Sequence, residues 1–164
     1  MANMTWKGLK EYERQLEKLI DANVVRGIAS NVVYVGAEVL ADQIRNGISS
    51  LPVVANDVHG SDAEKLSGIT QTQKDGLDES LGISPLRNEG GRYSRKVGFD
   101  GYNATKTRQY PNGQPNALIA RAVNSGTSFR QKIPFVDSAI RSARKDAEKA
   151  MAEEFDKSIE KVMK

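Results

Sequence analysis

Apolar residues recur at helical spacing in three segments of the chain. In the first segment, residues 9–20, the apolar positions share one face and charged side chains occupy the other; they are Leu9, Tyr12, Leu16, Leu19 and Ile20. Steps of three and four residues place side chains on the same side of a helix. We therefore expect an amphipathic helix here, preceded by a short strand at residues 5–7 and separated from it by Gly8.

The second segment predicts a longer helix. Asn23 is a favourable residue type at its N-terminus, and Asn46 with Gly47 favours termination at its end. The apolar stripe consists of Val25, Ile28, Val32, Val35, Val39, Leu40 and Ile44. Gly27 and Gly36 lie inside the helix, although each glycine costs about 1 kcal/mol there relative to alanine. Close packing against another helix is the expected reason.

The third segment has the longest apolar stripe, which continues almost to the last residue. Pro134 suits the first turn of a helix, and acidic residues near the start and basic ones near the end suit the helix dipole. The stripe consists of Val136, Ile140, Ala143, Ala147, Met151, Phe155, Ile159 and Val162. One small domain covers only part of such a length. We therefore expect Met151, Phe155 and Ile159 to form an interface with another protein chain.

The middle of the chain predicts loops and short strands. Residues 49–76 are polar, which favours an exposed loop or arm, or a short helix near residues 62–66. Residues 80–86 and 93–99 predict two strands joined by a hairpin-type connection. For residues 117–123 the pattern fits a short helix and a strand equally well.

Together these elements predict one α+β domain over residues 1–164, with three main helices packed on a small antiparallel sheet. The absence of cysteine excludes disulfides and thiolate chemistry. No apolar run approaches the roughly 20 residues that span a bilayer, and the first residues lack the apolar region of a signal peptide. We therefore expect synthesis in a cytoplasm, no export by the general route and no membrane partner.

Basic residues are concentrated in residues 87–133, which hold nine Lys or Arg and two Asp or Glu, although the whole chain has a net charge of only +3. Such a stretch fits a solvated loop, a surface that meets an acidic protein, or a surface that meets a polyanion. Tyrosines are interleaved with the basic residues, as in surfaces that contact nucleic-acid backbones. The candidate DNA contacts are Arg92, Arg95, Lys96, Lys106 and Arg108. Without a helix-turn-helix, zinc-finger or RNA-recognition motif, we expect DNA binding without sequence preference.

Side chains with catalytic or metal-binding chemistry are sparse. The single histidine, His59, lies near Asp57 and Asp62, but a transition-metal site needs further His or Cys ligands. A Ser-His-Asp triad would have to use the same histidine. Neither a phosphate-binding glycine loop nor a dinucleotide fingerprint is present. We expect no enzymatic activity, no cofactor and no small-molecule substrate, and a hydrolase that uses His59 is the less favoured alternative.

One motif of the C-terminal third is distinctive. An apolar segment is followed by a Gly-Thr turn and then by a Pro-Phe pair that opens the long helix; the motif residues are Asn124, Ser125, Gly126, Thr127, Pro134 and Phe135. Gly126 is expected to adopt a backbone conformation closed to residues with a Cβ. Thr127 or Ser128 is expected to hydrogen-bond the turned backbone. Pro134 pre-sets the start of the helix and Phe135 fills the core beside it.

This motif resembles the C-terminal signature of phage minor tail components of the tail-completion, or head–tail joining, family. The likeness extends over most of the chain. It includes a Gly-Leu pair at Gly8 before the first helix and a Gly-Leu-Xaa-Xaa-Ser-like segment that begins at Gly76. Family members commonly have an acidic residue before the Gly-Thr turn, whereas this chain has Asn124 and Ser125.

The resemblance implies a structural virion subunit at the neck or upper tail of a tailed bacteriophage or prophage, assembled in the bacterial cytoplasm. It would complete the tail or join it to the head. It also implies a homo-oligomeric ring such as a hexamer around the DNA channel, contacts with other neck or tail proteins, and non-specific contact with genome DNA. A non-specific DNA-binding module is the alternative function.

Overall fold

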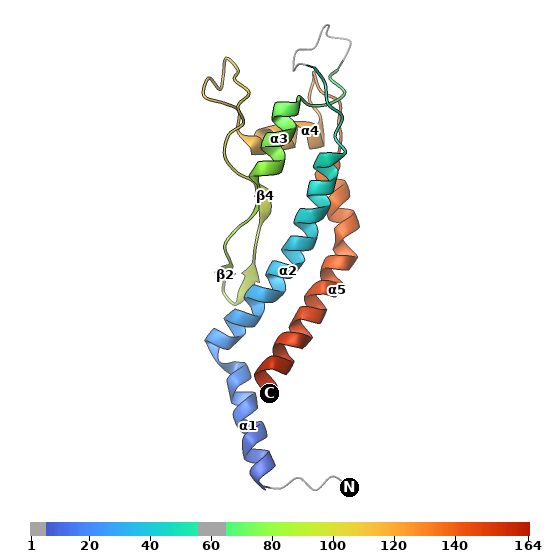
Figure 1. Cartoon of the computed structure of the whole chain (residues 1–164). Coiled ribbons are helices and arrows are strands. Elements are labelled where there is room, and N and C mark those ends of the chain that lie inside the picture. Colours follow the sequence, from blue (N-terminus) through green and yellow to red (C-terminus); the bar gives the residue numbers. More distant parts are fainter. Residues whose placement is uncertain (1–5, 56–64) are drawn as a thin grey trace.

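The fold of the chain is α+β, as the sequence predicts, in a computed structural model that describes residues 6–55 and 65–164 (Figure 1). The elements follow in the order α1 (Trp6–Ile20), α2 (Ala22–Ser49), α3 (Gln71–Ser80), β1 (Leu81–Ile83), β2 (Arg87–Glu89), β3 (Arg92–Ser94), β4 (Val97–Phe99), α4 (Asn116–Ser125) and α5 (Phe135–Met163).

The long helices α2 and α5 form an antiparallel pair that runs the length of the molecule (Figure 1). At one end of the pair, α3 and α4 pack across it. The strands run alongside α2. At the other end, α1 bends away from α2 and projects beyond the C-terminus of α5, so the molecule is elongated.

The predicted starts of the first two helices are wrong by a few residues. Trp6 and Gly8 belong to α1, so the strand expected at residues 5–7 is absent at Trp6 and the glycine does not break the helix. Helix α2 begins at Ala22 and not at Asn23, because Asp21 caps it. The Asp21 carboxylate accepts hydrogen bonds from the backbone N–H groups of Asn23 (2.9 Å) and Val24 (3.1 Å).

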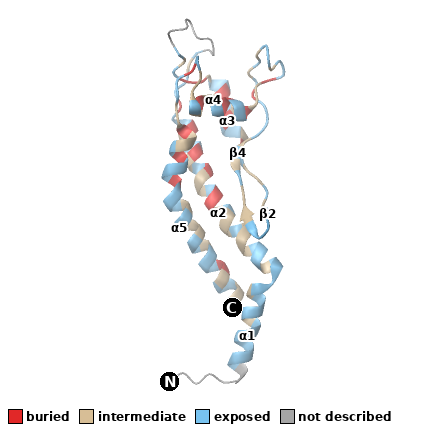
Figure 2. Ribbon diagram, turned by 180° about the vertical axis from the view of Figure 1, so that it is seen from behind, coloured by how far each residue is buried: buried red, intermediate tan, exposed pale blue. Residues whose placement is uncertain are grey.

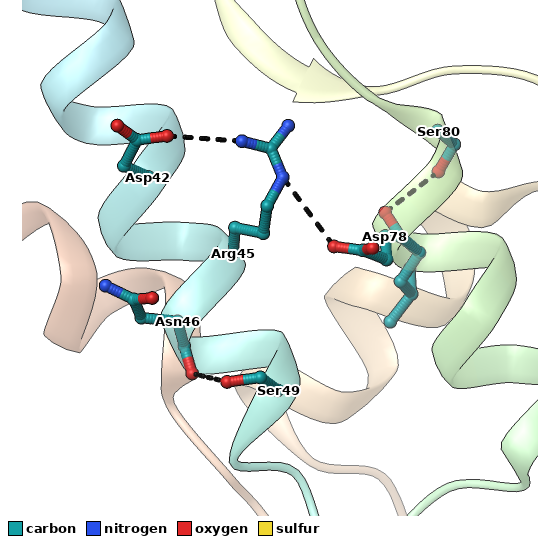
Figure 3. A network of polar contacts seen from close by, with 7 residues as sticks. Asp42, Arg45, Asn46, Ser49, Asp78 and Ser80 are labelled. Atoms are coloured by element: carbon teal, nitrogen blue, oxygen red, sulfur yellow. Dashed lines mark hydrogen bonds and ion pairs between the residues drawn. The ribbon is translucent and has the colours of Figure 1, made fainter.

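Helix α2 also continues past its predicted end at Asn46 and Gly47. Its last turn is fixed by α3, because the Lys74 ammonium donates to the carbonyl oxygens of Ser49 (2.6 Å) and Leu51 (3.0 Å). A cation at a helix C-terminus satisfies free carbonyl groups and suits the helix dipole. A second contact nearby joins the same helices, since Arg45 lies between Asp42 of α2 and Asp78 of α3 (Figure 3).

Part of the segment 49–76, expected to be an exposed loop, packs in the core or forms the start of α3. Ile69 is completely buried and forms a bridge with Val53. Thr70 and Gln73 form a reciprocal capping box that starts α3. The short helix expected near residues 62–66 lies mostly outside the described residues. Leu66, at its end, pairs in a bridge with Arg130.

The expected antiparallel pairing is confirmed, but the strand bounds differ: the strand predicted at 80–86 is shorter, the one predicted at 93–99 is divided into β3 and β4, and β2 reaches into the predicted connection. Strand β1 pairs antiparallel with β4, and β2 pairs antiparallel with β3 around the Asn88–Tyr93 register position. The turn between β2 and β3 contains Gly90 and Gly91, both at positive φ. Residues 117–123, which fitted a helix or a strand, lie in α4.

The hydrophobic core lies where α3, α4 and the strands cross one end of the α2–α5 pair (Figure 2). It includes Phe135, whose ring packs on Phe99 with centroids 6.2 Å apart. The other buried members of the core are Ile44, Ile48, Leu51, Ile69, Leu77, Leu81, Ile119, Ala120, Val123 and Ala139.

Small residues let α2 and α5 approach closely. A Cβ at Gly36 would lie 2.6 Å from the sulfur of Met151, so the close packing expected at this glycine is confirmed. At Gly27, the other glycine of α2, a Cβ would meet no described atom within 4 Å. Gly27 therefore has no packing role within the described part of the chain.

Helix α2 is the one helix among the described residues that is long and apolar enough, by length and composition, to cross a membrane. The sequence expectation that no such segment exists is corrected in that respect. One such helix is weak evidence for a membrane span, and only 17% of its most apolar 18-residue window is buried within the described molecule.

Candidate functional site

The motif residues 124–135 connect α4 to α5 and fix how the two helices are placed; we call this connection the joint. Gly126, just after α4, has φ 74° and ψ 166°, a conformation essentially restricted to glycine. A Cβ there would also lie 3.1 Å from the backbone nitrogen of Lys132. The conformational role predicted for Gly126 is therefore confirmed. Phe135 is buried in the core, also as expected, and Pro134 is the N-cap residue of α5.

Asn124 has a role that sequence reasoning missed. Pro134 offers no side-chain hydrogen bond to the start of α5. Instead, the Asn124 side-chain oxygen accepts hydrogen bonds from the backbone N–H groups of Val136 (3.0 Å) and Asp137 (3.2 Å). A residue of α4 thus caps α5 from outside its own sequence. An acidic residue, common in the resembled family near this turn, could accept the same bonds.

The expectation for the threonine of the motif is wrong. The backbone N–H of Thr127 donates to the Arg130 carbonyl at 3.0 Å, but its buried hydroxyl has no hydrogen-bond partner among the described residues. The Arg130 side chain donates to the Gly68 carbonyl and is buried. This contact holds the joint against the segment that precedes α3. Ser125, the remaining motif residue, is exposed at the end of α4.

The Gly-Leu segment of α3 is explained by a second close contact. The side-chain amide of Asn103 lies against Gly76 so closely that any Cβ there would overlap it. This amide donates to the Thr72 carbonyl (2.9 Å), and its oxygen accepts from the Thr105 backbone (2.9 Å). The next residue, Leu77, is completely buried. Gly76 therefore lets the loop after β4 dock on α3.

The five candidate DNA contacts do not form one cluster. Arg92 and Lys96 lie on the β-hairpin beside α2, and Lys106 and Arg108 lie in the loop between β4 and α4, near the core end. These four side chains are exposed and have no ion pair among the described residues. They follow the side of the molecule that the strands and this loop occupy (Figure 1).

Arg95, the fifth candidate, has a different role. Its guanidinium donates to the Ser84 carbonyl (3.0 Å) and the Ser30 hydroxyl (2.9 Å), and it lies 5.3 Å from the centre of the Tyr34 ring. A hydrogen bond from the Tyr34 hydroxyl to Glu38 raises the pKa of Tyr34. Because these contacts occupy the guanidinium, Arg95 holds the β-hairpin on α2 and is withdrawn from the DNA candidates.

The most unusual surface is apolar and lies at the end opposite the core. Between Gly8 and Val35, where every side chain is described, no residue is buried (Figure 2). On α1, Leu9, Tyr12 and Leu16 are between 44% and 49% exposed, and Ile20 is 80% exposed. We call these four residues the α1 stripe.

The α1 stripe leads into an apolar groove between α2 and the C-terminal part of α5. The groove has a volume of about 520 Å³ and is lined by Leu19, Val25, Ile28, Ala29, Val32, Val33, Gly91, Tyr93, Phe155 and Ile159. Two of the three residues expected at an interface, Phe155 and Ile159, line it, and Phe155 is 50% exposed. The third, Met151, packs on Gly36 within the chain.

The described residues contain no candidate metal site. No three His, Cys, Asp or Glu side chains within residues 6–55 and 65–164 gather closely enough to hold a metal ion. His59, Asp57 and Asp62 lie outside the described residues. No protein-family model, curated protein or solved structure matches the chain.

Proposed function

We propose that the chain is a structural, non-enzymatic virion subunit of a tailed bacteriophage or prophage. It completes the tail or joins it to the head at the neck. The observation that carries the structural role is the uncovered apolar surface formed by the α1 stripe and the groove. Contiguous exposed apolar surface of this kind marks a protein interaction site.

The phage assignment is supported by the resemblance. The residues that carry this resemblance have structural roles in the fold. Gly126 and Asn124 set the angle between α4 and α5, and Gly76 docks a loop on α3. These contacts fix how the elements of the subunit pack on one another. They suit a protein whose work is to present surfaces to neighbours in an assembly.

The test is deletion of the coding sequence from the phage or prophage that carries it. The expected result is filled heads and separate tails, or tails with abnormal ends, with infectious titre restored by the wild-type chain on a plasmid. Immunogold electron microscopy of complemented particles is expected to label the neck or upper tail. Infectious virions in normal number after deletion would contradict the proposal.

A non-specific DNA-binding module is the second candidate, favoured by the exposed positions of Lys106 and Arg108. Their charges have no partner among the described residues. In a ring around DNA such side chains would make weak phosphate contacts. The two functions are separable, because a DNA-binding module retains its function when the apolar surface at the opposite end is altered.

A further inference from the structure

We propose that the apolar surface is covered by a second copy of this chain, with the α1 stripe of one copy in the groove of the next. This inference deepens the proposed structural function, because it names the partner of the uncovered surface. The two halves of the contact, a projecting helix and a groove, are both present on every chain.

The shapes of the two parts fit each other. From Leu9 to Ile20 the α1 stripe extends about 16 Å, at 1.5 Å per helical residue, and its first three residues, Leu9 to Leu16, extend about 10 Å. The α2 wall of the groove, from Val25 to Val33, extends about 12 Å by the same measure. A helix with apolar residues at such spacing is a common occupant of an apolar groove. The groove is therefore long enough for the part of the stripe from Leu9 to Leu16.

The chain cannot fill its own groove with its own stripe. Helix α1 projects beyond the end of α5, and Leu19, in its last turn, is already part of the groove wall (Figure 1). The Asp21 cap fixes the start of α2 directly after α1. The rest of α1 therefore extends past the end of α5, and its stripe residues are exposed to another molecule.

The exposed area has the size that such a contact requires. The chain exposes 11371 Å², whereas a compact monomer of 18.0 kDa exposes about 8,000 Å². The residues outside the described ranges account for at most about 2,200 Å² of this area, if counted as unfolded chain. About 1,200 Å² of excess then belongs to the described residues, more than the roughly 800 Å² that one partner usually contributes to an interface.

In a helix-to-groove contact each chain uses two surfaces, because it contributes its stripe to one neighbour and its groove to another. Such a heterologous contact closes into a ring when the rotation between copies permits. The charges favour a protein over a bilayer as the occupant. Helix α1 carries four Lys or Arg and three Glu, whereas helices that lie on membranes are rich in Lys and Arg on their polar face.

The test measures the association of the full-length chain by analytical ultracentrifugation between about 1 and 100 μM, the range of moderate affinities. The wild type is expected to associate with increasing concentration. The variant Leu9→Gln/Leu16→Gln is expected to associate at least about tenfold more weakly. Glu11→Gln/Lys18→Gln, which alters the other face of α1 without changing net charge, is the matched control and is expected to behave as the wild type.

A mixing experiment separates this contact from a symmetrical one. Phe155→Gln/Ile159→Gln makes the α5 side of the groove polar and leaves the stripe, so it is also expected to associate at least about tenfold more weakly than the wild type. Mixed with Leu9→Gln/Leu16→Gln, it is expected to form a heterodimer, because one variant supplies an intact stripe and the other an intact groove. If the groove variant loses its circular-dichroism helix signal, Phe155→Ala replaces it.

Three results would overturn the inference. They are a wild-type chain that stays monomeric over the whole range, a stripe variant that associates like the wild type, and a mixture that stays monomeric. Flotation with vesicles of phosphatidylcholine and phosphatidylglycerol (3:1) tests the bilayer: if the wild type binds vesicles through the stripe without self-association, a membrane is the occupant. Failure of these tests leaves the deletion phenotype untouched, so the two proposals fail separately.

Discussion

The side-chain oxygen of Asn124 accepts a hydrogen bond from the backbone N–H of Val136 at 3.0 Å and so caps a helix to which Asn124 does not belong. The bond joins the end of α4 to the start of α5 across the nine residues that connect them. Because α5 is half of the long helical pair, the direction of that pair depends on this joint.

Replacement of Asn124 by alanine is expected to lower the free energy of unfolding by about 1 kcal/mol, the usual loss for a helix cap. Asn124→Asp keeps the acceptor and places a negative charge at the helix N-terminus, so it is expected to retain most of the stability. Urea unfolding followed by circular dichroism measures both. Ser125→Ala, at the exposed neighbouring position, is the control; an equal loss in the control would contradict the capping role.

Gly76→Ala is expected to destabilise the chain although alanine favours helices. The added Cβ overlaps the Asn103 amide, and overpacking costs about 1–3 kcal/mol against a propensity gain of about 1 kcal/mol. Gly27→Ala is the matched control, because a Cβ there meets no described atom within 4 Å. We expect the control to raise the thermal midpoint and Gly76→Ala to lower it. A rise in both midpoints would refute the close contact.

Gly126→Ala is expected to cost about 1–3 kcal/mol, since alanine rarely adopts the backbone angles found there. Gly82→Ala, at a position with open space and no positive φ, serves as the comparison. The difference between the two urea midpoints is the measurement. Equal midpoints would mean that the joint tolerates a different turn.

Lys106→Ser/Arg108→Ser is expected to weaken binding to random duplex DNA without a change in unfolding free energy, because exposed charges contribute little to stability. Wild-type binding itself is expected to be weak and to fade between about 50 and 200 mM salt as counterion release is suppressed. Lys145→Ser/Lys149→Ser, on the exposed side of α5, removes the same charge elsewhere. Identical salt titrations for both double variants would show that Lys106 and Arg108 face protein or solvent.

Helical periodicity predicts which face of a segment is apolar, and at that level the sequence was informative. It placed the stripes of α1, α2 and α5, and the α+β class followed from them. Periodicity does not indicate whether anything covers a stripe: Leu16 and Ile44 both belong to predicted apolar stripes, yet Ile44 is buried and Leu16 is exposed. Only the tertiary arrangement distinguishes the two.

Contacts between residues far apart in the chain could not be predicted from the sequence either. Lys74 caps a helix that ends 25 residues earlier, and the cap at Asn124 likewise acts outside its own segment. Composition misled at residues 65–76, because a polar stretch can start a helix when a Thr–Gln capping box satisfies its first N–H groups. Composition also misled in the basic stretch, because Arg95 was expected to contact DNA but its guanidinium makes hydrogen bonds within the chain.

Because the core occupies one end of the helical pair, resistance to local opening is expected to be graded along the molecule. Backbone amides of α1 and the first half of α2 have few buried neighbours, and such regions open at free energies far below that of global unfolding. Deuterium is therefore expected to enter these helices first and the turns around Ile48 and Val123 last. The same amides provide a direct readout of assembly, since their exchange should slow when another molecule covers the apolar end.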